Sequence, residues 1–294
     1  MLETEVAVPI RAITAEEKKR FQEDGVVCLR GVLSPDWIEE LRTGVDEVLS
    51  RPGPAGKNIG EGGGRFGYDI FMWTFNETFR RFQEEGPMGE WAAQLLDSQR
   101  SYLAVDAMFV KEPGTPNHTP WHHDQPYLWL DGQQVLSFWT PLDTVTADSG
   151  AIDWIPGSHR WGKWFKPKGF DPKNYVDYPD IFEEIPDIEA AREQYGVMHF
   201  DTEPGDLVVH HLLTLHHSPG NATQGRRRRA LGIRYVGDDV TFATRAMGPR
   251  PLYDVGLKQG DAIGSDMFPQ VWPRTSEGLG PKAARVSKLT PVIK

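Results

Sequence analysis

The chain has 294 residues, of which 39% are hydrophobic, and it includes 14 Phe and 10 Trp, enough apolar material for one large core. The formal net charge of −10 argues against nucleic acid as a partner, because phosphate binding needs a basic face. No segment approaches the run of about 18 apolar residues that a bilayer-spanning helix requires, so we expect no membrane interaction.

The single cysteine, Cys28, lies in the apolar run from Val26 to Leu29, which favours a buried and inert thiol. One cysteine excludes an internal disulfide, which is typical of a reducing compartment. Met1 to Glu5 show no basic segment followed by an apolar stretch, so no secretory signal is recognised. These features predict a cytoplasmic protein.

The N-terminal third carries helix signals. Thr14 to Glu17 form a capping box that opens a short helix, which runs through Phe21 and stops at Gly25. Residues 26–33 have the composition of a strand. Ser34 and Pro35 then supply an N-cap and a proline in the first turn, and the apolar spacing that follows predicts a helix over 35–50.

The next segments are less regular. Residues 51–67 are rich in Gly and Pro and predict a loop, either a lid or a connector. Residues 68–82 are dense in aromatics, which indicates core or the wall of a substrate pocket. From this stretch we take Phe71 and Trp73 as candidate substrate-binding residues, and we add Trp154 from the Trp-rich segment 154–165. Residues 87–96 predict a helix.

From Ser101 onward the pattern changes to that of strands. We expect one domain over residues 1–294, in which helices from 14–97 support a β-sandwich or barrel and residues 160–200 form an insertion near the mouth of the site. The predicted strands cover residues 101–111, 135–142, 206–213, 228–236 and 240–246.

A His-x-Asp triplet, His122 and Asp124, carries the first chemical signal. In an extended strand these two side chains leave the backbone on the same face. A second histidine-rich segment follows at 209–218. Two histidines and one carboxylate form the ligand set of non-haem Fe(II) oxygenases, which keep further coordination positions open. The triplet alone also arises by chance, and His118, His159 and His199 are interpreted as ordinary core or surface residues.

Several stretches together resemble the phytanoyl-CoA dioxygenase (PhyH-like) family of Fe(II)/2-oxoglutarate oxygenases. The resemblance spans roughly residues 14–241 and implies a mainly β fold with flanking helices, built on a double-stranded β-helix (jelly-roll, cupin-like) core. It is carried, in this order, by Phe21 to Ser34, Trp121 to Gln125, Ser149 to Ala151, Ile155 to His159, and Gly205 to Asn221 with the arginines that follow.

The resemblance also implies site residues. His122, Asp124 and His216 match the Fe(II) ligands, and an arginine at the start of the next strand matches the group that binds the far carboxylate of 2-oxoglutarate. Counting back from the family's Arg-x-Ala strand pattern gives Arg228, whereas counting forward from His216 gives Arg227. We favour Arg228, because period-two alternation puts it on one face with two small residues. The resemblance places three further residues beside the co-substrate: Met108, Trp139 and Ser218.

The implied activity is the oxidation of an unactivated C–H bond of a small organic metabolite, coupled to the conversion of 2-oxoglutarate and O₂ into succinate and CO₂. The carboxylate of Asp124 argues against halogenation, since halogenating relatives have a small residue there to admit chloride. Two alternatives are a non-catalytic metal- or metabolite-binding jelly-roll protein and a zinc hydrolase. The hydrolase has no visible general base and gives the arginine no role.

Overall fold

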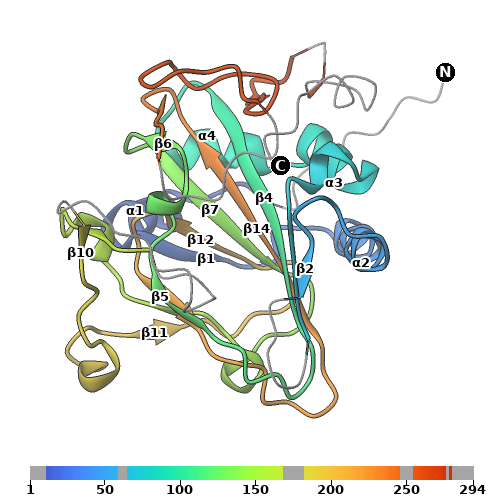
Figure 1. The fold of residues 1–294 in the computed structure, drawn as a ribbon, viewed down its shortest axis with the longest axis vertical. Helices are drawn as coiled ribbons and strands as arrows, with labels where there is room; N and C mark the ends of the chain where they lie inside the picture. Colours follow the sequence, from blue (N-terminus) through green and yellow to red (C-terminus); the bar gives the residue numbers. More distant parts are fainter. Residues whose placement is uncertain (1–10, 59–64, 168–181, 246–253, 276–277, 280–294) are drawn as a thin grey trace.

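Two facing antiparallel sheets form the centre of the molecule, and helices cover the outer side of the larger sheet (Figure 1). The computed structural model describes residues 11–58, 65–167, 182–245, 254–275 and 278–279. Together the sheets form the double-stranded β-helix that the resemblance implies.

The larger sheet has the order β1-β12-β7-β14-β4-β3-β2, with β16 paired to the start of β4. Its strands are β1 (Val26–Leu29), β2 (Lys57–Asn58), β3 (Phe66–Ile70), β4 (Ser101–Lys111), β7 (Val135–Pro141), β12 (Leu207–His211), β14 (Arg228–Val236) and β16 (Gln270–Trp272).

The smaller sheet has the order β11-β8-β13-β5 and carries the histidine-rich segments. Its strands are β5 (Thr119–His122), β8 (Asp153–Trp154), β11 (Met198–His199) and β13 (His216–Ser218). Two short pairs lie outside both sheets: β6 (Leu130–Asp131) with β15 (Thr241–Phe242), and β9 (Trp164–Phe165) with β10 (Phe182–Glu183).

The helices are α1 (Ala15–Asp24), α2 (Pro35–Ser50), α3 (Glu77–Glu85) and α4 (Met88–Leu96). The capping box predicted at Thr14 is present, and Gly25 ends α1 in the left-handed conformation at φ 67°. Ser34 caps α2 as expected. The sequence does not predict α3. Its buried residues Phe79 and Phe82 belong to a continuous aromatic stretch, which hides the helical spacing of this face.

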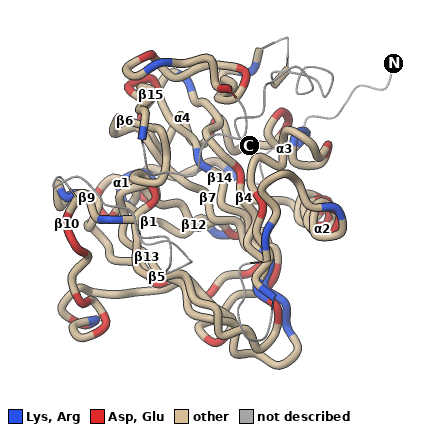
Figure 2. The backbone as a smooth tube through the Cα atoms, in the orientation of Figure 1, with Lys and Arg blue, Asp and Glu red and all other residues tan. Residues whose placement is uncertain are grey.

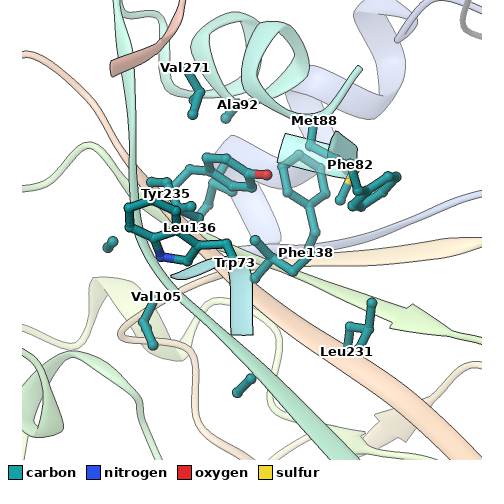
Figure 3. Close-up of a cluster of buried hydrophobic side chains, with 14 of the residues drawn as sticks. Trp73, Phe82, Met88, Ala92, Val105, Leu136, Phe138, Leu231, Tyr235 and Val271 are labelled. Carbon is teal, nitrogen blue, oxygen red and sulfur yellow. The ribbon is translucent and has the colours of Figure 1, made fainter. Parts of the chain in front are cut away.

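The main core lies between these helices and the larger sheet. Figure 3 shows Trp73, Phe82 and Met88 on the helical side against Leu136, Phe138 and Tyr235 of the sheet. Trp73 is fully buried here and does not line the cavity described below, so the structure does not place it among substrate-binding residues. Its indole fills the core because α3 and α4 need an apolar partner.

Most strand predictions are confirmed, and β4 and β14 have the predicted bounds. The histidine-rich segment forms two strands rather than one, because residues 212–215 turn between β12 and β13. The last predicted strand shortens to β15. Parts of three predicted segments lie outside the described residues: 59–64 of 51–67, 168–181 of 160–200, and residue 246 of 240–246.

Within the segment 160–200, the backbone N–H of Phe165 donates to His123 Nε2 at 2.9 Å. Within the described ranges, no helix is long and apolar enough to cross a membrane.

Candidate metal and co-substrate site

His122, Asp124 and His216 come together between the two sheets. His122 ends β5 and lies directly opposite His216 of β13, with ring centres 4.1 Å apart. One ligand atom from each of the three side chains lies within 4.8 Å of the others. The prediction of an extended strand through Asp124 was wrong, because Asp124 adopts φ −74° and ψ −38° at the start of a 3₁₀ turn. This turn brings the carboxylate to the side of His122.

Backbone carbonyls fix the orientation of both imidazoles. His122 Nδ1 lies 2.8 Å from the carbonyl oxygen of Pro120, and His216 Nδ1 lies 2.9 Å from that of Thr214. Each Nδ1–H therefore donates to a carbonyl oxygen, and each Nε2 faces Asp124. Burial, followed by the charge of His122, lowers the pKa of His216 well below its ordinary value, so His216 is held neutral as a metal ligand must be.

Arg234 holds the outer oxygen of Asp124. Its Nε and Nη2 both lie 3.0 Å from Oδ2, while Oδ1 faces His122 Nε2 at 3.5 Å and His216 Nε2 at 3.8 Å. Burial alone would raise the pKa of Asp124, but the charge of Arg234 brings it well below its usual range. The carboxylate is therefore ionised and presents one oxygen to the space between the histidines. Sequence reasoning missed Arg234.

Arg228 is a buried cation at another end of the same cavity. Nη2 lies 3.4 Å from Ser218 Oγ and Nη1 lies 3.4 Å from the Phe109 carbonyl, while Nε has no partner among the described residues. Burial lowers its pKa to about 10. No carboxylate in the described part of the chain pairs with it. A buried guanidinium without a counter-ion is costly, so this end of the cavity fits an anion.

Lys111 adds a second buried positive group, and sequence reasoning missed it too. Its Nζ donates to Ser218 Oγ at 2.9 Å and to the carbonyl oxygens of Ser218 and Pro219. Burial and the neighbouring charge of Arg228 hold its pKa well below the ordinary value. A lysine at the end of a predicted strand normally reaches solvent, so nothing in the sequence indicates that Lys111 is buried.

The neighbouring arginines lie outside the cavity. Arg227 pairs with Asp46 at 3.1 Å and with Glu112 at 2.8 Å, and Arg229 pairs with Asp143 at 2.8 Å. In Figure 2, basic and acidic positions are interspersed along the described chain. The structure therefore brings Arg228, and not Arg227, to the metal cluster, in line with strand alternation.

The other predicted residues divide between the cavity and the core. Phe71, Trp139 and Ser218 line the cavity. Met108 does not: it lies on the other face of β4 and lines a separate cleft with Val48, because Phe109 takes the inward position. Trp154 lies behind the ligands, with its ring 4.9 Å from that of His216.

The remaining wall is mainly aromatic and aliphatic. The space in the cavity, counted together with the open solvent at its mouth, is about 1240 Å³. Its apolar lining includes Phe66, Tyr68, Phe109, Leu128, Trp129 and Phe268.

Two imidazoles, one ionised carboxylate and a buried arginine without a carboxylate partner in the described part of the chain match the needs of Fe(II) and a dicarboxylic 2-oxo acid. Fold and site together define a non-haem iron oxygenase that depends on 2-oxoglutarate.

The chain belongs to the phytanoyl-CoA dioxygenase (PhyH) family, whose profile matches residues 21–230. It is 25% identical over 239 residues to the multifunctional dioxygenase prhA of Penicillium brasilianum, covering 78% of this chain and 74% of that protein. It is therefore a 2-oxoglutarate-dependent dioxygenase.

Solved structures agree on the fold. The 2-oxoglutarate-dependent carbocyclase SnoK of nogalamycin biosynthesis superposes with a TM-score of 0.69 at 22% identity, covering 88% of this chain and 96% of SnoK. The epimerase SnoN, in complex with Fe³⁺, α-ketoglutarate and nogalamycin RO, gives 0.65 at 20% identity, covering 87% of this chain and 97% of SnoN. Fe(II), 2-oxoglutarate and O₂ are the cofactor and co-substrates of this class.

Proposed function

We propose that this protein hydroxylates a small organic metabolite while 2-oxoglutarate is converted to succinate and CO₂. The observation that carries the proposal is the cluster of His122, Asp124 and His216 in the same cavity as Arg228, a buried cation with no carboxylate partner among the described residues. Fe(II) bound there would supply oxidation of an unactivated C–H bond with O₂.

The chain's own residues bind and orient the reactants. His122, Asp124 and His216 would hold the metal. Arg228, with Ser218 beside it, would bind the far carboxylate of 2-oxoglutarate through a planar pair of N–H donors. Trp139 forms an apolar wall next to that guanidinium, whose carbon lies 5.9 Å from the ring centre.

The aromatic side of the cavity would bind the substrate and exclude water. Phe71 and Tyr68 belong to this wall. Trp154 supports it only indirectly, through its contacts with His216 and His210. Such a wall favours an apolar or amphipathic small molecule, and with the acidic overall charge it supports neither nucleic acid nor a membrane as partner.

The test is succinate formation from 2-oxoglutarate with Fe(II) and O₂. We expect turnover by the native protein and its loss in His216→Ala and in Asp124→Ala. His217→Ala is the matched control, because His217 is adjacent in sequence but stacks on Trp121 outside the cavity. Full activity of Asp124→Ala would contradict the metal assignment.

A second measurement separates an enzyme from a binding protein. Candidate metabolites are screened for stimulation of O₂ uptake by the Fe(II)-loaded protein. A stimulated rate with a hydroxylated product supports the proposal. Binding of metabolites without any O₂ uptake or succinate would favour a non-catalytic jelly-roll protein.

A further inference from the structure

Three polar side chains form one row across the floor of the cavity. His210 of β12 lies directly opposite Ser137 of β7, which in turn lies directly opposite Arg234 of β14. All three line the cavity. Directly opposite residues on neighbouring strands have Cβ atoms about 5 Å apart, so the three side chains act on one small region.

Two members of this row have no hydrogen-bond partner in the described part of the chain. Both ring nitrogens of His210 and the hydroxyl of Ser137 are unpaired, although the two residues are only 3% and 1% exposed. A buried polar group that stays unpaired is costly, whereas such groups are favourable where a ligand completes their hydrogen bonds. The row therefore fits a polar ligand atom.

This ligand atom would lie beside the metal. His210 Nε2 is 3.5 Å from Asp124 Oδ2, without forming a hydrogen bond to it. The His210 ring lies 4.8 Å from that of His216, and Trp154 packs against both rings. His210 is thus held in place by aromatic contacts; Nδ1 is free for a ligand, and Nε2 makes only the 3.5 Å approach to Asp124 Oδ2.

The distance between this row and Arg228 matches the length of a five-carbon dicarboxylate. The guanidinium of Arg228 sits beside Trp139, which is two residues from Ser137 on the same face of β7. Two residues of a strand advance roughly 6.6 Å, which is of the order of the length of an extended five-carbon dicarboxylate. One carboxylate at Arg228 thus brings the other to the row of His210 and Ser137.

We propose that His210 and Ser137 bind the C1 carboxylate of 2-oxoglutarate, the end next to the metal, while Arg228 binds the far carboxylate. This inference rests on the proposed function. His210 is a positioning residue: a ring N–H and the Ser137 hydroxyl donate to the carboxylate and orient the 2-oxo acid. Arg234 stays engaged with Asp124.

The test compares two ligands by calorimetric titration of the Fe(II)-loaded protein without O₂. 2-Oxoglutarate has both carboxylates, and 2-oxopentanoate keeps the C1 carboxylate and keto group but lacks the far one. We expect His210→Phe to weaken both by the same factor, about ten- to a hundredfold, as for a lost hydrogen bond to a charged acceptor. Ser137→Ala should act in the same direction. Arg228→Met should weaken 2-oxoglutarate alone.

Controls distinguish recognition from a folding defect. His210→Gln can place an amide N–H near the position of Nε2, so it should recover most of the affinity that His210→Phe loses. His217→Phe should bind both ligands like the native protein, because that ring lies outside the cavity. Thermal unfolding checks that each variant is folded.

The outcomes separate the two proposals. If the native protein with Fe(II) binds no 2-oxoglutarate, the proposed function itself is wrong. If native and His210→Phe proteins bind 2-oxoglutarate equally, only the role of His210 is overturned. A loss confined to 2-oxoglutarate, or a loss of Fe(II) affinity in His210→Phe, would also contradict the assignment to the C1 carboxylate.

Discussion

Arg227 and Arg228 are sequence neighbours with opposite environments, one paired on the surface and the other buried in the cavity. Successive side chains of a strand point to opposite faces, and this alternation separates Arg227 from Arg228. The separation is predictable from the sequence once the bounds of the strand are known. The sequence could not reveal that Arg228 has no carboxylate partner among the described residues, because its surroundings come from strands far apart in the chain.

The arginine assignment predicts unequal effects of two substitutions. Arg228→Met should raise the KM for 2-oxoglutarate roughly 100-fold, because it removes charge-assisted hydrogen bonds to a carboxylate in a buried site. Arg227→Met should leave this KM within about twofold, since its partners are surface carboxylates. Steady-state kinetics of succinate formation measures both, and the reverse order would contradict the assignment.

Arg234 should control metal binding through Asp124. Arg234→Leu frees Oδ2 and leaves a buried carboxylate without its partner, so we expect Fe(II) affinity to fall about ten- to a hundredfold. Arg234→Lys should retain part of it. Competition with a chelator measures the affinity, and an unchanged value in Arg234→Leu would show that the turn alone orients Asp124.

Arg234 and Lys111 could not be predicted, because their partners are remote. Arg234 and Asp124 are 110 residues apart in sequence, and Lys111 and Ser218 are 107 apart. His122 and Asp124 could be proposed from their spacing and residue types, whereas His216 could be chosen among the histidines of residues 209–218 only through the family resemblance. The predicted extended strand through Asp124 was nevertheless wrong, because a 3₁₀ turn brings its carboxylate to the side of His122.

At the scale of elements, β4 shows what period-two patterns can decide. The strand's bounds were predictable, but Met108 and Phe109 are both apolar, so only the structure shows which one faces the cavity. Similarly, the aromatic stretch before α3 divides between cavity and core: Phe71 lines the cavity, and Trp73 lies in the core.

This division predicts that Trp73 matters for stability and Phe71 for the cavity. Trp73→Ala should lower the free energy of unfolding by about 3–5 kcal/mol, as for other large-to-small core changes. Its affinity for 2-oxoglutarate should stay native in the folded fraction. Denaturant unfolding and calorimetry measure the two effects, and a stable variant with weakened ligand binding would contradict the division.

Asp106, on the helix-facing side of β4, makes stability depend on pH. Burial raises its pKa to about 7, well above the ordinary value of an aspartate, and the backbone N–H of Trp73, which donates to Asp106 Oδ2, offsets this only in part. The unfolded chain therefore loses this proton at lower pH than the folded one, and stability falls as pH rises from about 4 to about 7.

The matching variant is Asp106→Asn, which cannot ionise. Relative to the native protein, its stability should improve between pH 4.5 and pH 7.5 by up to roughly 4 kcal/mol. Denaturant unfolding at both pH values measures this difference. A constant difference would mean that Asp106 does not titrate in this range.

For the whole molecule, ligands that bind only the folded state should stabilise it. At a concentration 100 times its Kd, 2-oxoglutarate adds about 2.7 kcal/mol, which corresponds to a rise in Tm of about 5 °C. Removal of the metal should abolish this rise. Arg228→Met should keep the stabilisation by metal while losing that by 2-oxoglutarate at the same concentration, which differential scanning fluorimetry can measure.

His210 and Ser137 lie on β12 and β7, and Arg228 lies on β14, so the two ends of the proposed co-substrate site belong to neighbouring strands of one sheet. Neighbouring strands lie about 4.8 Å apart, and residues advance about 3.3 Å along each strand. The backbone hydrogen bonds of the sheet keep both distances fixed. A 2-oxo diacid one carbon longer or shorter would fit both ends less well, so the geometry of the sheet itself, and not any single residue, would select the five-carbon chain.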